Sequence, residues 1–125
     1  LVQEMVAGVE FIIGVREDPQ YGPFMVAGLG GVLVEAMRDV ALRLLPLTGA
    51  EAQAMLGELR GKAVFGAFRG AKPRDMEALV AAMCGLSETF LDHRDFLSDL
   101  EVNPLMVLAE GKGVRAVDVR PVRKV

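Results

Sequence analysis

The sequence predicts an α+β fold in which a mainly antiparallel sheet is combined with two principal helices. Segments rich in Val, Ile and Phe occur in successive pairs separated by short turn signals, which is typical of hairpins. Helical periodicity first appears after Pro46 and returns after Asp75. With 125 residues, of which 52% are hydrophobic and 25% charged, the chain is sized for one folded domain.

The first part of the chain is predicted to be β-structure. Its expected strands cover residues 1–6, 9–16, 24–29 and a part of 32–45. The stretch 18–23 contains two prolines and a glycine and is predicted to be a loop. Gly28-Leu29-Gly30-Gly31 either lets the backbone approach a phosphate or is a plain glycine-rich turn, and no clear helix follows it.

Both helices have sequence signals at their N-termini. Thr48 and Glu51 form a capping-box pattern, and apolar residues at helical spacing predict a helix over about 49–60. Asp75 is the expected N-cap of the second helix, whose apolar residues form one stripe. Between the helices, 61–73 is predicted to be a basic loop.

The last two strands, over 96–108 and 114–119, form a predicted hairpin whose register follows from its turn. If the turn is centred on Gly111-Lys112, Leu105 faces Asp118 across the hairpin, and Asn103 faces Arg120. Side chains alternate between the two faces of a strand, so Asn103 and Asp118 emerge on one face, a diagonal step of about 7 to 8 Å apart.

Glu101 shares the face of Asn103 and Asp118. An amide oxygen and two carboxylates that converge in this way form a hard-oxygen site suited to Mg²⁺. The alternative is an ordinary polar pairing with Arg120 at the sheet edge. A change of one residue in register would send Asp118 to the other face.

Composition excludes several classes of protein. The net charge of −3 and the dispersed basic residues disfavour nucleic acid as a partner. The longest stretch without polar side chains, residues 23–34, is shorter than the ~18 to 20 residues that cross a bilayer, so no membrane partner is expected. The lone Cys84 is consistent with a cytoplasmic location.

The chain begins at Leu1 directly within an alternating pattern, with no initiator Met and no turn. We therefore expect it to be part of a longer protein. Apolar surface that meets the missing part would then be exposed, which makes a homo-oligomer possible.

The sequence resembles the C-terminal part of the ATP-grasp domain of NDP-forming (ADP-forming) acyl-CoA synthetases, relatives of the succinyl-CoA synthetase beta subunit. The matching stretches, in family order over nearly the whole chain, are Gly8-Val9-Glu10 through Gly14, residues 18–23, Gly28 through Glu35, the loop from Arg69-Gly70 to Pro73, and Leu100 through Leu105 followed by Ala116-Val117-Asp118. The Asn-Pro-Leu strand with its later Asp, behind a Gly-Gly-x-x-x-Glu run, is specific in combination.

The resemblance implies roles for individual residues. Asn103 and Asp118 match the two magnesium ligands. Glu101 matches an acidic position that helps hold the phosphohistidine loop during phosphoryl transfer, which makes it the catalytic candidate.

Other matches of the resemblance concern the nucleotide. Gln3, Glu4, Met5 and Val6 match the hinge segment whose backbone meets adenine, and Glu10 falls where related domains place a residue near the ribose. Glu35, together with Asp18 and Arg69, matches motif positions that would support the phosphates or the metal.

The resemblance also implies an activity. The implied activity is that of an acyl-CoA synthetase (ligase), which couples cleavage of an acyl-CoA thioester to formation of ATP from ADP and phosphate, or the reverse. The implied cofactors are Mg²⁺ and ATP/ADP. The other ATP-grasp subdomain, the CoA-binding regions and the catalytic histidine are expected in the remaining domains or in another subunit, so that 1–125 alone is inactive. The alternative is a regulatory, non-catalytic domain of this type fused to a protein acetyltransferase.

Overall fold

The structure, a computed structural model, describes residues 1–30, 39–67 and 70–125. Within these residues, an antiparallel sheet of six strands packs against two α-helices, which confirms the predicted α+β class. The strands are β1 (Val9–Asp18), β2 (Gly22–Leu29), β3 (Val40–Leu44), β4 (Leu97–Val107), β5 (Val114–Ala116) and β6 (Val119–Arg123). The helices are α2 (Gly49–Glu58), α3 (Met76–Asp92) and the short 3-10 helix η1 (Lys62–Phe65), which lies in the predicted basic loop.

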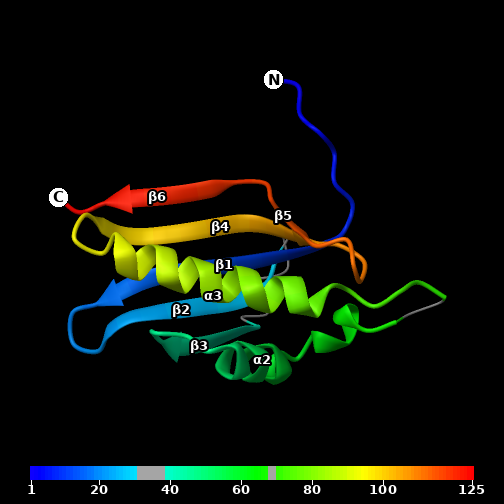
Figure 1. Cartoon of the computed structure of the whole chain (residues 1–125), viewed down its shortest axis with the longest axis horizontal. Coiled ribbons are helices and arrows are strands. Elements are labelled where there is room, and N and C mark those ends of the chain that lie inside the picture. The colour runs from blue at the N-terminus through cyan, green and yellow to red at the C-terminus, as the bar shows by residue number, and fades with distance from the viewer. Residues whose placement is uncertain (31–38, 68–69) are drawn as a thin grey trace.

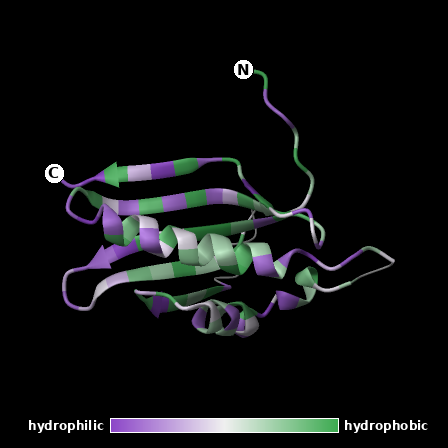
Figure 2. Cartoon of the chain, in the orientation of Figure 1, coloured by the Kyte–Doolittle hydropathy of each residue, from purple (hydrophilic) through white to green (hydrophobic). Residues whose placement is uncertain are grey.

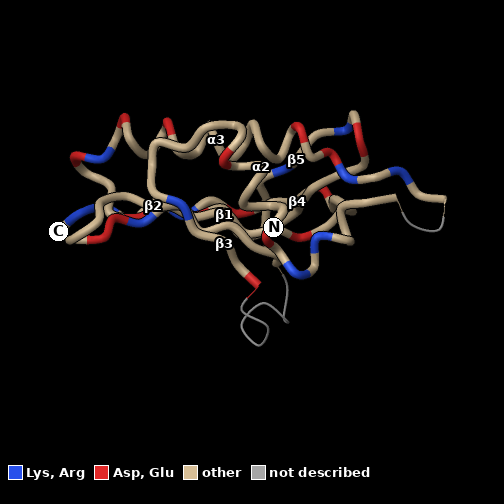
Figure 3. The backbone as a smooth tube through the Cα atoms, turned by 90° about the horizontal axis from the view of Figure 1, so that it is seen from below, with Lys and Arg blue, Asp and Glu red and all other residues tan. Residues whose placement is uncertain are grey.

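The sheet has β1 and β4 at its centre. Its order is β3-β2-β1-β4, and both β5 and β6 pair with the outer side of β4. The helices α2 and α3 lie on one face of the sheet (Figure 1). The edge-on view shows the strands as a thin layer with α3 and α2 on a single side (Figure 3). The opposite face, which we call the open face, has no described helix over it.

The hydrophobic core lies between the sheet and the helices. Strand β1 contributes Phe11, Ile13 and Val15, and α3 contributes side chains such as Leu79 and Phe90, all of them buried. The Phe11 ring meets the ring of Phe65 from η1 edge to face, with 5.7 Å between centroids. Hydrophobic and hydrophilic residues are interspersed along β6 (Figure 2), whose five residues are all exposed.

Both predicted helix starts are confirmed. The Glu51 N–H donates to Thr48 Oγ1 at 3.1 Å and the Thr48 N–H donates to Glu51 Oε2 at 3.0 Å, which completes the capping box of α2. The Asp75 side chain accepts from the Ala78 N–H at 3.1 Å and caps α3. These signals are local, so the sequence was sufficient to locate them.

Asp75 also binds the turn between β4 and β5, which the sequence did not indicate. Its Oδ2 accepts from the N–H groups of Gly111 at 3.1 Å and Gly113 at 2.8 Å. The N–H groups of Ala78, Gly113 and Gly111 hold the pKa of the Asp75 carboxyl below its usual range, against the opposing effect of burial. One carboxylate thus ties the start of α3 to the hairpin turn.

We expect the Asp75→Asn variant to be less stable than the parent at neutral pH, because an amide oxygen replaces a carboxylate that accepts from three backbone donors. A lowered pKa in the folded state stabilises the fold above the unfolded pKa of about 3.9, and this contribution disappears as the pH falls through the folded pKa. Urea unfolding at a series of pH values should therefore show that the parent has a larger free energy of unfolding than the variant. This difference should be constant above about pH 5 and disappear in acid. A difference independent of pH would contradict this assignment.

The predicted strand over residues 1–6 is wrong. Regular pairing begins at Val9, and the preceding segment leads away from the sheet (Figure 1). Leu1 and Val2 are fully exposed. A strand needs a neighbour for its backbone groups, and the described part of the chain supplies none for this segment.

Among the described residues, no helix is long and apolar enough to cross a membrane.

Two glycines of the run 28–31 lie where backbones pass closely. A Cβ on Gly28, within β2, would stand 2.7 Å from the Asp39 carbonyl oxygen. A Cβ on Gly30 would stand 3.1 Å from the carbonyl carbon of Glu10, whose oxygen accepts the Gly30 N–H at 2.8 Å. Close strand packing explains these two positions. Gly31 lies outside the described residues.

Candidate functional site

Asn103 and Asp118 lie directly opposite each other. The Asn103 N–H donates to the Asp118 carbonyl oxygen at 3.0 Å. The predicted pairs of Leu105 with Asp118 and of Asn103 with Arg120 are wrong, since Leu105 pairs with Ala116 and Glu101 pairs with Arg120. Each partner is displaced by two residues from the predicted register. An even displacement leaves side chains on the same face, so the predicted convergence survives the wrong register.

The turn itself explains the displacement. The Leu108 N–H donates to the Gly113 carbonyl at 3.1 Å, so the turn is centred one residue earlier than predicted. Gly111 and Gly113 both have positive φ, at 83° and 84°, and the Asp75 carboxylate holds their N–H groups. A residue distant in sequence therefore contributes to the register of this hairpin.

A β-bulge in β4 lies at Asn103-Pro104. On the neighbouring strand β1, Phe11 pairs with Leu105 and Ile13 pairs with Val102, so that two residues of β4 face Ile12. Proline has no N–H to donate and is tolerated inside a sheet mainly at such bulges. Val102 and Leu105 both enter the core, whereas Asn103 is exposed.

Four side chains line a pocket of about 280 Å³ here: Glu101, Asn103, Asp118 and Arg120. Arg120 donates from Nη2 to Glu101 Oε2 at 3.1 Å. The sequence left open whether this face carries a cluster of oxygen donors or an ordinary polar pairing with Arg120. The structure contains both. Of the predicted site residues, Glu101, Asn103 and Asp118 are brought into one pocket.

The donor set of this pocket fits a hard divalent cation. Its amide and carboxylate oxygens are the ligand types that Mg²⁺ takes, usually with several waters retained. Within residues 1–30, 39–67 and 70–125, no three side chains of His, Cys, Asp or Glu form a metal-binding group. A cation held by Asn103 and Asp118 would therefore complete its coordination with water or with oxygens of a substrate.

A second pocket, of about 210 Å³, adjoins the first on the open face. Its lining residues are Ile12, Gly14, Val15, Arg16, Val26, Asp99, Glu101 and Arg120. It shares Glu101 and Arg120 with the first pocket, and the ion pair of Arg16 and Asp99 (3.4 Å) borders it. No local sequence pattern predicts this pocket, because it depends on the pairing of β1 with β4. The signal present was the two-residue spacing of Ile12, Gly14 and Arg16.

The predicted nucleotide residues are only partly assembled. Glu10 is exposed on β1, two residues from Ile12, and pairs with Met106. Residues 3–6 belong to the unpaired N-terminal segment and do not line the pocket. Glu35 and Arg69 lie outside the described residues. Asp18 accepts from the N–H groups of Gln20 and Tyr21, both at 2.8 Å, which explains it as a turn residue.

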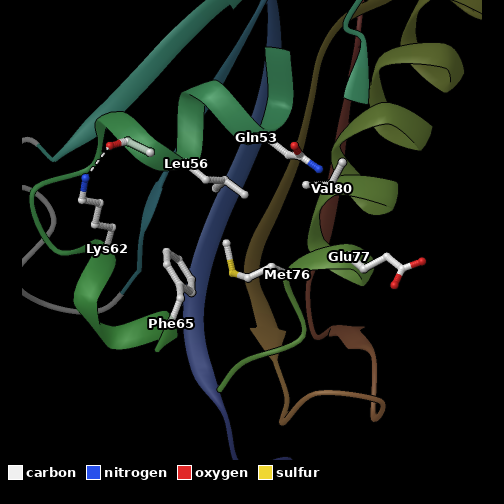
Figure 4. Close-up of a pocket in the computed structure, with 8 residues that line it drawn as sticks. Gln53, Leu56, Lys62, Phe65, Met76, Glu77 and Val80 are labelled. Carbon is white, nitrogen blue, oxygen red and sulfur yellow. Dashed lines mark hydrogen bonds between the residues drawn. The ribbon is translucent and has the colours of Figure 1, made fainter. Parts of the chain in front are cut away.

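A separate pocket of about 350 Å³ lies on the helical side, between α2, η1 and α3 (Figure 4). Leu56, Phe65 and Met76 are among its apolar lining residues. Lys62 Nζ donates to the Gly57 carbonyl oxygen at 3.1 Å. None of the predicted site residues that the structure describes lines this pocket, whereas Glu101, Asn103 and Asp118 line the pocket on the open face.

Comparisons with known proteins show which proteins the chain is similar to. The chain is 38% identical over 117 residues to the acetate–CoA ligase [ADP-forming] II subunit beta of Pyrococcus furiosus, covering 94% of this chain and 50% of the relative. It is 40% identical over 123 residues to acetate–CoA ligase [ADP-forming] I of Archaeoglobus fulgidus, covering 98% of this chain and 18% of the relative. The chain thus spans half or less of these relatives.

A solved structure shares the fold. The dinucleotide-forming acetyl-coenzyme A synthetase 1 of Candidatus Korarchaeum cryptofilum, in complex with coenzyme A and Mg-AMPPCP, superposes with a TM-score of 0.88 at 34% identity. The match covers 96% of this chain and 55% of that chain. The sequence pattern of the ATP-grasp domain matches residues 1–122. The chain therefore belongs to the ATP-grasp domain family.

Proposed function

We propose that this chain forms the Mg²⁺- and nucleotide-binding part of an ADP-forming acyl-CoA synthetase. Such an enzyme couples cleavage of an acyl-CoA thioester to formation of ATP from ADP and phosphate, or the reverse. The observation that carries the proposal is the direct opposition of Asn103 and Asp118, beside Glu101, on the open face of the sheet. The relatives support it, because both are named as ADP-forming acetate–CoA ligases.

The proposed metal ligands are the side-chain oxygens of Asn103 and Asp118. Phosphoryl transfer depends on positioning and on neutralising charge. When bound, Mg²⁺ supplies that neutralisation at the phosphates. The two side chains project from a hairpin with a fixed register, so they need little rearrangement to act together.

Glu101 is proposed as the residue that holds a phosphohistidine loop supplied by another part of the enzyme. Its neighbouring residues on β4 are buried, which fixes its backbone, and its carboxylate lies beside the proposed metal ligands. In the Korarchaeum enzyme, the phosphohistidine segment is described as pointing towards the nucleotide binding site. The proposal places Glu101 at the corresponding nucleotide-binding site, where its carboxylate would accept hydrogen bonds from that segment.

The nucleotide base is proposed to lie against the backbone of residues 3–6, with Glu10 near the ribose. This segment has no regular secondary structure, and no strand pairing involves it among the described residues. The family match covers residues 1–122, so the segment belongs to the matched domain. The assignment of Glu35 to the phosphates or the metal stays a prediction.

The remaining domains or subunits of the synthetase are the proposed partners. The chain spans 50% of a relative that is itself named as a subunit. A regulatory domain of a fused acetyltransferase is not favoured, because the relatives are named as ligases. The homo-oligomer and the cytoplasmic location stay predictions.

The test compares residues 1–125 with the full-length protein that contains them. We expect the full-length protein to form ATP from acetyl-CoA, ADP and phosphate in a reaction that requires Mg²⁺. The isolated chain should be folded by circular dichroism and inactive, because only a part of the cleft is present. The proposal fails if the full-length protein shows no acyl-CoA-dependent nucleotide turnover with acetyl-CoA or with a panel of other acyl-CoA thioesters.

A further inference from the structure

Arg120 is a cation in a pocket otherwise lined by oxygen donors. Its guanidinium group donates to Glu101 Oε2 at 3.1 Å, and its residue position on β6 is fixed by pairing with Glu101 on β4. Arg120 also lines the adjoining pocket that contains Ile12 and Gly14. The side chain therefore forms part of the wall between the two hollows of the open face.

A guanidinium at this place opposes the binding of a free divalent cation. The pocket holds two carboxylates and one guanidinium, so its net charge is less negative than the carboxylates alone would make it. The Arg120 guanidinium and a divalent cation are both positive, so they repel each other within one pocket. A metal ion accompanied by phosphate presents both signs of charge, and the oxygen donors and the guanidinium can then each meet a group of opposite charge.

The ion pair of Arg120 with Glu101 is suited to exchange. The Arg120 side chain is 64% exposed and the Glu101 side chain 28% exposed. Exposed pairs of this kind contribute little stability, so breaking this one costs little. Arginine binds phosphate oxygens with a planar fork of donors, which makes a phosphate an adequate replacement for the carboxylate.

We propose that Arg120 is a phosphate-binding residue of this site and that it exchanges the Glu101 carboxylate for a phosphate oxygen when a nucleotide binds. The exchange leaves the Glu101 carboxylate free to accept hydrogen bonds from other donors. Binding of the nucleotide and the availability of Glu101 are thereby coupled through one guanidinium. This inference rests on the proposed function.

The test uses the full-length protein and measures ADP binding by isothermal titration calorimetry, with and without MgCl₂. Arg120→Ala should weaken binding of ADP with Mg²⁺ by about 10- to 100-fold, the equivalent of one hydrogen bond between charged groups. Mn²⁺ alone, followed by electron paramagnetic resonance, should bind the variant at least as tightly as the parent, because a repelling charge has been removed. Arg123→Ala, which removes the same charge from the same strand, should change neither value.

Two further variants keep the outcome interpretable. Arg120→Lys retains the charge but not the fork, and should lose part of the ADP affinity while leaving the thermal unfolding temperature unchanged. Glu101→Gln should tighten ADP binding several-fold in the parent but not in the Arg120→Ala background. Unchanged ADP affinity in a folded Arg120→Ala protein, or the same Glu101→Gln gain in both backgrounds, overturns the inference. Absence of ADP binding by the parent overturns the proposed function instead.

Discussion

Asp118→Asn in the full-length protein is expected to lower the rate of Mg²⁺-dependent ATP formation by about 10² to 10³, the usual loss when one stabilising group is removed from a polar site. The change is nearly isosteric and keeps an oxygen that can act as a ligand. It also leaves intact the backbone contact of Asn103 with the Asp118 carbonyl (3.0 Å), so the hairpin should persist. What is lost is one negative charge beside a cation that binds phosphates.

Steady-state rates measured over a range of Mg²⁺ concentrations test this expectation. Asn103→Ala should act in the same direction, and the double variant should lose less than the two single losses combined, since both residues act on one ion. Asp95→Asn, in the exposed turn between α3 and β4, is the matched control. An Asp118→Asn enzyme with the parental rate and Mg²⁺ requirement would show that this pocket is not the metal site.

Phe11→Ala is expected to destabilise the chain by about 3–5 kcal/mol, as is typical when a large buried aromatic residue is truncated. Phe11 is completely buried at the centre of the sheet and packs against the Phe65 ring. Truncation would leave a cavity in the core between the sheet and the helices and remove the aromatic contact. Because small domains are stable by about 5–15 kcal/mol, a large share of the folding free energy would be lost.

Urea unfolding of the isolated chain measures this change. Leu42→Ala, on the open side of β3, is the control, because its residue is 53% exposed. It should cost about 1 kcal/mol or less. Equal losses for the two variants would contradict the assignment of the core to the helical side of the sheet.

The sequence was sufficient for features that depend on nearby residues. The capping box of Thr48 and Glu51 and the N-cap at Asp75 predicted both helix starts, because each signal lies within one turn of the helix it begins. The shared face of Asn103 and Asp118 was also predictable, because it depends only on the parity of the register.

Features that depend on distant partners were not predictable. The strand over 1–6 has the right composition, but no described neighbour pairs with it. The register of the last hairpin is coupled to Asp75, which lies more than thirty residues before the turn that it binds. The pocket containing Ile12 and Asp99 requires the pairing of β1 with β4, which no local pattern reveals.

The bulge in β4 has a consequence for how the gene can change in length. Val102 pairs with Val119 and Leu105 pairs with Ala116, so two residues of β4 lie opposite two residues of the segment that joins β5 to β6. On the other side of β4, the same two residues lie opposite a single residue of β1. Deleting Pro104 alone would make β4 regular against β1 but would displace Asp118 from Asn103. Insertions or deletions of a codon in these two segments therefore preserve the site only in matched pairs.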